Sequence, residues 1–311
     1  MVAMADAARD FAAQLLQLEP RAAALAALAL AALAALAALL ALRAARARAA
    51  PQLTREFQRF TVSERVVANP ANAARPVIFL TLRVSTASLP TGAHVKLRAP
   101  AGPGGAAVVR SYTPTRFRRG ECELMFRVYE GGPMTQHLHG LRVGDSVEMM
   151  GPTGLERYGL AGPGTFARGT SQEWAGISHV GLIAGGTGVT PMLQIANHVL
   201  QDPRDATRLS LLCFTTTPDD IILEEALRAL AARSAGQLRL TFVASHASEA
   251  ELRARPGLRC ASMRALDAAE LEVMLGIPRG PHSMVCVCGP DGFSRQAKAL
   301  LSETFENVLV W

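Results

Sequence analysis

The stretch HVGLIAGGTGVTPML, residues 179–193, decides the fold of the C-terminal half of the chain. An apolar strand runs into glycines and then into apolar residues at helical spacing, which is typical of a strand–loop–helix unit. The loop of such a unit presents backbone N–H groups and the positive end of a helix dipole to an anion. Pro191 stands where a dinucleotide fingerprint has its third glycine, and proline suits the first turn of a helix. The stretch alone leaves two alternatives open, a nucleotide contact or a tightly packed turn.

The rest of the C-terminal half repeats this strand–helix alternation. Three more apolar runs, RLSLLCF, LRLTFVA and HSMVCVCG, are separated by segments with helical apolar spacing. Nearly continuous apolar runs are typical of parallel strands buried on both faces. Residues 177–311 are therefore predicted to form a doubly wound α/β domain whose ligand binds at the carboxyl ends of the strands.

Residues 55–158 show a different period. Short alternating runs such as VIFLTLRV, HVKLRA and ELMFRVY are separated by turn residues, which predicts an antiparallel barrel or sandwich. One helical segment, PMTQHLHGL at 133–141, interrupts them and has proline in its first turn. Residues 159–176 are rich in glycine and small polar residues and are predicted to be an interdomain loop.

The N-terminal part carries a long apolar run. Residues 22–42 contain no charged or polar side chain and are long enough to cross a bilayer, which predicts a transmembrane anchor after a leader at 1–21. A basic linker at 43–54 follows, and by the positive-inside rule the bulk of the chain faces the cytosol. An alanine-rich soluble helix or an organellar presequence remains the alternative.

Charge and cysteine content exclude several classes of protein. The formal net charge is +6, but no basic run is interleaved with aromatic residues, so nucleic acid is not an expected partner. The five cysteines are odd in number and scattered without a C-x-x-C pair. This spacing argues against a disulfide framework and against a metal site, and it fits reduced thiols in the cytosol.

Five short motifs carry the chemistry. RSYTP at 110–114 places Arg110 and Tyr112 on one face of a strand, where a guanidinium beside an aromatic ring suits a flat phosphorylated ligand. An exposed strand face with a cation–π pair is the alternative. The other motifs are GGPMTQ at 131–136, GPTG at 151–154, GGTGVTPM at 185–192 and CGPDGF at 288–293. Their order resembles the ferredoxin reductase superfamily of flavoenzymes and, within it, the cytochrome b5 reductases, over roughly residues 55–311.

That resemblance implies a Greek-key antiparallel barrel that holds FAD, followed by an α/β domain that binds the pyridine nucleotide. In the first domain it implies that Arg110 pairs with the FAD diphosphate and that Tyr112 packs on the isoalloxazine. Thr113 would hydrogen-bond near flavin N5, supported by His94. Pro133 stands where related reductases often have lysine, and Arg127 is expected to compensate for the missing charge. The other residues expected to contact FAD are Gly132, Met134, Thr135 and Thr190.

In the second domain the resemblance implies a nicotinamide site between the GGTG and CGPDGF loops. Cys288 would set the approach of the nicotinamide and, with Thr113 and His94, would complete the catalytic set. Ser245 stands where the family usually has an aspartate that repels a 2′-phosphate, so NADH is expected only narrowly over NADPH. The residues expected to contact NAD(P)H are Gly186, Thr187, Gly188, Ser245, Cys288, Gly289, Pro290 and Phe293.

The implied reaction passes a hydride from NADH to FAD and then single electrons to cytochrome b5 or a similar haem protein. The membrane would be the endoplasmic reticulum or the outer mitochondrial membrane, with the catalytic domains in the cytosol. Two alternatives remain. One is a reductase of the same superfamily with another acceptor, such as a quinone or a desaturase chain, and the other is a non-enzymatic, membrane-tethered nucleotide-binding module.

Overall fold

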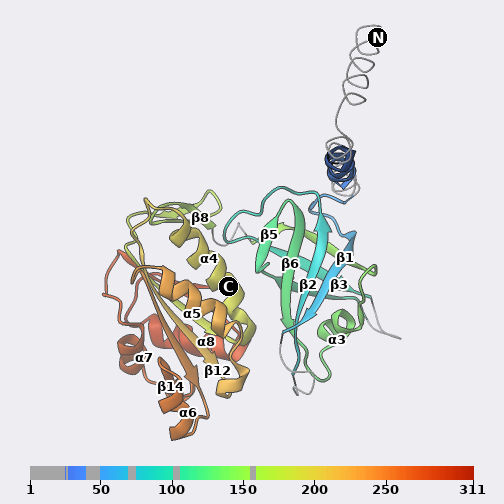
Figure 1. Cartoon of the computed structure of the whole chain (residues 1–311). Helices are drawn as coiled ribbons and strands as arrows, with labels where there is room; N and C mark the ends of the chain where they lie inside the picture. Colours follow the sequence, from blue (N-terminus) through green and yellow to red (C-terminus); the bar gives the residue numbers. More distant parts are fainter. Residues whose placement is uncertain (1–24, 26, 40–49, 69–74, 101–105, 155–158) are drawn as a thin grey trace. The chain divides into compact units, whose positions relative to one another are not determined.

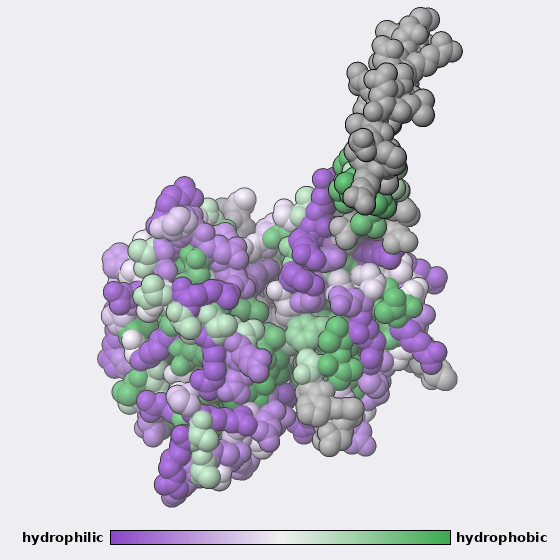
Figure 2. Space-filling view, in the orientation of Figure 1, coloured by the Kyte–Doolittle hydropathy of each residue, from purple (hydrophilic) through white to green (hydrophobic). Residues whose placement is uncertain are grey.

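The computed structural model describes residues 25, 27–39, 50–68, 75–100, 106–154 and 159–311. The chain divides into two compact units, residues 1–50 and 51–311. In the first unit residues 27–39 are helical, and the leucines of this helix are exposed; where it is visible in Figure 2, its surface is hydrophobic. No helix in the described part of the chain is long and apolar enough to cross a membrane. The predicted anchor at 22–42 lies partly outside the described residues and is not confirmed.

The second unit begins with an antiparallel sheet (Figure 1). Within the described residues its strand order is β4-β3-β7-β1-β2-β6-β5. The strands are β1 (Gln58–Val67), β2 (Val77–Val84), β3 (His94–Ala99), β4 (Val108–Tyr112), β5 (Arg116–Arg118), β6 (Gly120–Arg127) and β7 (Ser146–Thr153). Alternate residues of β3 are buried, as a sheet with one face on the core requires. The predicted antiparallel domain is confirmed, and its helix α3 (Pro133–Gly140) lies in the predicted position.

Residues 159–176 form short strands where the glycine-rich composition predicted a loop. These strands are β8 (Gly159–Gly162), β9 (Thr165–Arg168) and β10 (Gln172–Trp174), which pair as a small antiparallel sheet. The glycines serve its turns, since Gly164 and Gly169 have φ values of +59° and +54°. The side chain of Phe166 on β9 is buried in the same apolar core as Leu182 and Ile195.

The C-terminal part is the predicted parallel sheet with helices on both faces (Figure 1). Within the described residues the strand order is β14-β13-β12-β11-β15-β16. The strands are β11 (His179–Gly185), β12 (Arg208–Thr215), β13 (Leu238–Ala244), β14 (Leu258–Cys260), β15 (Ser283–Cys288) and β16 (Val308–Val310). The helices are α4 (Val189–Gln201), α5 (Glu224–Arg233), α6 (Glu249–Ala254), α7 (Ala268–Leu275) and α8 (Asp291–Leu301). Helices α4 and α5 contribute to one core cluster, and α7 and α8 contribute to the other.

The connections of this sheet reverse direction between β11 and β15. From β11 the chain moves outward through β12, β13 and β14, and it then returns to place β15 on the other side of β11. In doubly wound sheets a ligand crevice opens at such a switch point, beyond the carboxyl ends of the strands. The fold therefore places a binding crevice between the loops that follow Gly185 and Cys288.

Several contacts join the two halves of the second unit. The Gly92 N–H donates to Gln194 Oε1 at 2.8 Å, and Gln194 Nε2 donates to the Ala93 carbonyl at 3.2 Å. Val77 and Met125 of the antiparallel sheet also belong to the same apolar core as α4 and β11. These contacts hold the loop before β3 against helix α4.

Candidate functional site

The two loops at the switch point meet through backbone atoms. Gly188 closes the short 3-10 helix η1 (Gly186–Gly188), directly before α4. A Cβ atom on Gly188 would lie 2.2 Å from the Cys288 carbonyl oxygen and 2.9 Å from the Gly289 nitrogen. Only glycine permits this approach, because neither neighbour is a flexible side chain. Gly186 has a φ of +55°, so it provides the left-handed turn that starts the loop.

Phe293 packs beneath both loops. A Cβ on Gly185 would lie 2.9 Å from the Phe293 ring, and one on Gly289 would lie 2.6 Å from it. The ring also makes an edge contact with Phe214, with centroids 5.4 Å apart. The sequence expectation that Phe293 contacts NAD(P)H stays a prediction, while its observed contacts show that it supports the crevice floor.

Cys288 lies at the end of β15, and the residue as a whole is half-buried. Burial raises the pKa of its thiol to about 12. The sulfur is therefore protonated at neutral pH, and it can act in the crevice by contact rather than as a thiolate. Pro290 follows as the N-cap of α8 and is exposed.

The residues of the GGTGVTP loop divide between the crevice and the core. Thr187 is half-buried, whereas Thr190 is only 6% exposed. The Thr190 hydroxyl donates to the Thr187 carbonyl at 3.2 Å, which closes the first turn of α4. Pro191 sits in the same turn and is buried, so its missing N–H leaves no unpaired donor.

The antiparallel domain presents Arg110 and Tyr112 on β4, an edge strand within the described sheet. Arg110 is exposed, and its Nη1 donates to the neighbouring Val109 carbonyl at 2.8 Å. Tyr112 is half-buried against the core, and burial raises the pKa of its phenol to about 12. A cation and a neutral aromatic ring thus share one face of a strand whose outer edge is open, as a flat, phosphorylated ligand requires.

Thr113 follows β4 directly, and His94 begins β3, the strand that pairs with β4. The ladder pairs Val95 with Tyr112, and continuing the same antiparallel register places His94 opposite Thr113. Gly154 makes room for the imidazole, since a Cβ there would lie 2.4 Å from His94 Nδ1. The GPTG motif therefore serves the histidine, a role that its sequence did not reveal.

Helix α3 begins at the GGPMT loop. Gly132 is its N-cap and has no capping side chain, and Met134 is buried. The Thr135 hydroxyl donates to the Gly132 carbonyl and accepts from the Tyr129 N–H, each at 3.2 Å. This hydroxyl therefore closes the turn, and backbone N–H groups of the first helical turn remain as anion donors.

Arg127 lies where β6 ends and is 7% exposed. Its Nη2 donates to the Asp220 carbonyl at 2.6 Å, and its Nη1 lies 3.3 Å from Asp220 Oδ1. The expected FAD contact of Arg127 stays a prediction. Its observed partner, Asp220, comes from the second half of the unit, and the sequence analysis assigned Asp220 no role.

A cavity of about 470 Å³ lies beyond the carboxyl ends of β12 and β13. Ser245 is one of its lining residues, and its N–H donates to the Thr215 carbonyl at 3.0 Å. The other lining residues are Thr217, Pro218, His246, Ala247, Ser248, Glu251 and Cys260. Three strand spacings separate β15 from β13, or roughly 14 Å. A dinucleotide can therefore extend along the sheet edge from Cys288 to Ser245. We call this cavity the Ser245 pocket.

Two family matches cover most of the described second unit. Residues 67–158 match the oxidoreductase FAD-binding domain, and residues 182–299 match the oxidoreductase NAD-binding domain. The expected cofactors, FAD and NAD, are confirmed by these matches. The order of the two matches is the order of the antiparallel and parallel sheets along the chain.

Three curated relatives are named as NADH-cytochrome b5 reductases. NADH-cytochrome b5 reductase 1 of Bos taurus is 41% identical over 176 residues, which cover 52% of this chain and 56% of the relative. NADH-cytochrome b5 reductase 2 of Gallus gallus is 34% identical over 217 residues, covering 65% and 67%. NADH-cytochrome b5 reductase 2 of Rattus norvegicus is 32% identical, covering 67% and 76%. The chain thus spans between about half and three quarters of these relatives.

Solved structures give the same two-domain fold. The cytochrome b5 reductase domain of Ulva prolifera nitrate reductase has a TM-score of 0.71 and 26% identity, covering 84% of this chain and all of that one (100%). A ferredoxin NADP+ reductase from Neisseria gonorrhoeae with bound FAD and NADP has a TM-score of 0.59 and 16% identity, covering 82% and 98%. The second likeness concerns the fold alone.

Proposed function

The chain belongs to the NADH-cytochrome b5 reductase family, and on this premise we propose that it oxidises NADH and reduces cytochrome b5 or a similar haem protein. FAD, when bound, supplies the chemistry that accepts a hydride and releases electrons singly. The proposal depends on two features that occur in one unit. One is an open edge strand that bears Arg110 and Tyr112, and the other is a crevice at the switch point, bounded by Gly188 and Cys288.

The antiparallel domain fits FAD by its donor set. The exposed Arg110 guanidinium would hold the diphosphate, and the N–H groups at the start of α3 would add donors for it. The Tyr112 ring would pack against the isoalloxazine from the same strand face. Pro133 removes one N–H from this helix start, and Met134 and Thr135 keep theirs.

Thr113 and His94 would act at the reacting end of this site. The register of β3 and β4, continued by one residue beyond the ladder, would set them opposite each other. The Thr113 hydroxyl would hold a proton near flavin N5, and His94 would fix the orientation of that hydroxyl. The two residues thus position one hydrogen bond at the atom that receives the hydride.

The parallel-sheet half of the second unit would hold the nicotinamide. Because Gly188 has no Cβ, its loop contacts the Cys288 backbone, and Thr187 stays half-buried at the mouth of the crevice. The protonated Cys288 thiol would limit the approach of the ring by contact and would exclude water. Ser245 would face the adenosine ribose, and we propose NADH as the donor.

The acceptor and the membrane complete the proposal. Residues 22–42 would anchor the reductase to the endoplasmic reticulum or the outer mitochondrial membrane, with its catalytic domains in the cytosol. Attachment to the membrane of the acceptor raises the effective concentration of the two proteins without new contacts. The sequence pattern of residues 22–42 supports the anchor, and the names of the relatives support cytochrome b5 as the acceptor.

Steady-state reduction of purified cytochrome b5 by the FAD-loaded full chain and NADH tests the function. A panel of soluble quinones serves as the comparison. We expect a kcat/KM for cytochrome b5 well above that for any quinone. A kcat/KM for a quinone that exceeds the value for cytochrome b5 contradicts the proposed acceptor.

A further inference from the structure

Helix α6 brings an acidic side chain into the Ser245 pocket. Glu251 lines the same cavity as Ser245, although the two residues lie six positions apart and belong to different elements. We propose that Glu251 excludes the 2′-phosphate of NADPH and so makes the chain selective for NADH. This inference rests on the proposed function, because it assigns the adenosine part of the nucleotide to this pocket.

Glu251 is held in place at the start of α6. Its Oε2 accepts hydrogen bonds from the Ser248 N–H at 2.8 Å and from the Ser248 hydroxyl at 2.6 Å, while Ser248 caps the helix. Both bonds go to Oε2, so among the described residues no hydrogen bond or ion pair engages Oε1. These hydrogen bonds, with the nearby Arg255 guanidinium, lower the pKa of Glu251. The pocket therefore has a fixed negative charge at neutral pH.

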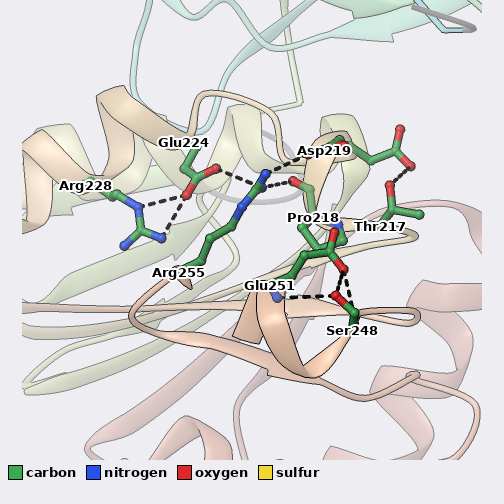
Figure 3. A network of polar contacts seen from close by, with 9 residues as sticks. Thr217, Pro218, Asp219, Glu224, Arg228, Ser248, Glu251 and Arg255 are labelled. Carbon is green, nitrogen blue, oxygen red and sulfur yellow. Dashed lines mark hydrogen bonds and ion pairs between the residues drawn. The ribbon is translucent and has the colours of Figure 1, made fainter. Parts of the chain in front are cut away.

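The Arg255 guanidinium, whose charge acts on Glu251, is bound by other groups. Figure 3 shows this guanidinium between the carboxylates of Asp219 and Glu224. Its Nη2 lies 2.6 Å from Asp219 Oδ1, and its Nη1 donates to the Pro218 carbonyl at 2.7 Å and lies 3.6 Å from Glu224 Oε2. Arg228 also binds Glu224, at 2.8 Å. This network holds three carboxylates, counting Glu251, against two guanidinium groups, so it offers a phosphate no unpaired arginine.

Two other basic residues lie near the pocket. Arg259 is adjacent to the lining residue Cys260 on β14, and neighbouring residues of a strand point to opposite faces. His246 lines the pocket with an exposed ring and is the one basic side chain among its described lining residues. His246 is therefore the residue that would oppose Glu251, and the experiment includes it.

The test compares NAD+ and NADP+ binding to the FAD-loaded chain by titration calorimetry, together with kcat/KM for NADH and NADPH. Glu251→Gln removes the charge and keeps the cap, because glutamine serves the third helical position of a capping box. Glu249→Gln is the matched control, since Glu249 stands on the same turn but is exposed and pairs with Arg253. His246→Asn is measured alongside them.

We expect Glu251→Gln to tighten NADP+ binding about tenfold and to change NAD+ binding less than about twofold, as for a carboxylate and a phosphate about 8 Å apart in a wet pocket. Glu249→Gln changes neither constant, and His246→Asn weakens NADP+ binding only. Glu251→Ala, which removes the carboxylate together with its hydrogen bonds to Ser248, gives the same shift in selectivity, and circular dichroism shows whether α6 is kept in both variants.

An unchanged ratio of NADP+ to NAD+ affinity in Glu251→Gln overturns the inference, and so does an equal shift in Glu249→Gln. A wild-type chain that binds NADP+ more tightly than NAD+ also overturns it. These outcomes leave nucleotide binding intact, whereas a chain that binds neither nucleotide contradicts the proposed function itself.

Discussion

Replacing Gly188 by alanine tests the crevice most sharply, because the new methyl group meets backbone atoms. Its Cβ would lie 2.2 Å from the Cys288 carbonyl oxygen, whereas ordinary contact begins near 3.4 Å. The two loops must therefore move apart by about 1.2 Å. Overpacking of this kind costs about 1–3 kcal/mol, against a gain of about 0.4–1 kcal/mol from the stiffer unfolded chain. We expect the free energy of unfolding to fall by about 1–2 kcal/mol.

The functional effect should exceed the effect on stability. A displacement near 1 Å between reacting groups costs up to about 100-fold in rate, because the nicotinamide no longer lies in the reactive geometry. Stopped-flow reduction of the bound flavin by NADH measures this rate, and thermal unfolding measures the stability. Gly292→Ala is the control, since apart from its chain neighbours and its own helix backbone nothing lies within 4 Å of the new Cβ. A Gly188→Ala variant with wild-type flavin reduction and stability would refute the close approach of the two loops.

Three further changes test other parts of the site. Arg110→Ala should weaken FAD binding by about 10- to 100-fold in fluorescence titration, because one charge-assisted hydrogen bond is lost. Arg116→Ala on β5, at the other end of the described strand order, should not weaken it, and equal affinities of the two variants would contradict the diphosphate role. Arg127→Ala should lower the free energy of unfolding by about 2 kcal/mol, since Asp220 loses its ion-pair partner and keeps only the hydrogen bond from the Thr217 hydroxyl, and a loss below about 0.5 kcal/mol in denaturant titration would contradict a stabilising pair between the two halves. Burial raises the pKa of the Cys288 thiol in the folded protein to about 12, whereas the thiol in the unfolded chain has a pKa of about 8.5. The folded state therefore favours the protonated thiol, and the associated stability is present below about pH 8.5 and is lost as the pH rises toward 12. Urea titrations from pH 7 to 10 should therefore show a shallower alkaline decline for Cys288→Ala than for the wild type, and parallel curves would contradict it.

The sequence predicted those parts of the fold that depend on local patterns. Continuous apolar runs such as HSMVCVCG identify buried parallel strands because both faces of the sheet are covered. The sequence also predicts that the loops after β11 and β15 form one crevice, because the carboxyl ends of parallel strands lie at the same edge of the sheet. The strands β8 to β10 were missed, because glycine lowers strand propensity even where it is needed for the turns between strands.

The missed site residues depend on contacts between distant segments. Arg127 and Asp220 are 93 residues apart, and only the docking of the two halves brings them together. Glu251 carried a local signal, because Ser248 and Glu251 have the spacing of a capping box. That spacing predicts the start of a helix but does not reveal which cavity the helix start faces. The side of the sheet on which α6 lies decides which cavity its first turn faces, and no short-range sequence pattern predicts that side.

Spectra of the purified, detergent-solubilised chain during anaerobic titration with NADH test the proposed electron transfer most directly. We predict that about one equivalent of NADH bleaches the flavin absorbance and that oxidised cytochrome b5, added afterwards, gains about two reduced haems per NADH. A chain without flavin absorbance even after FAD is added, or a bound flavin that NADH does not bleach, would contradict this function.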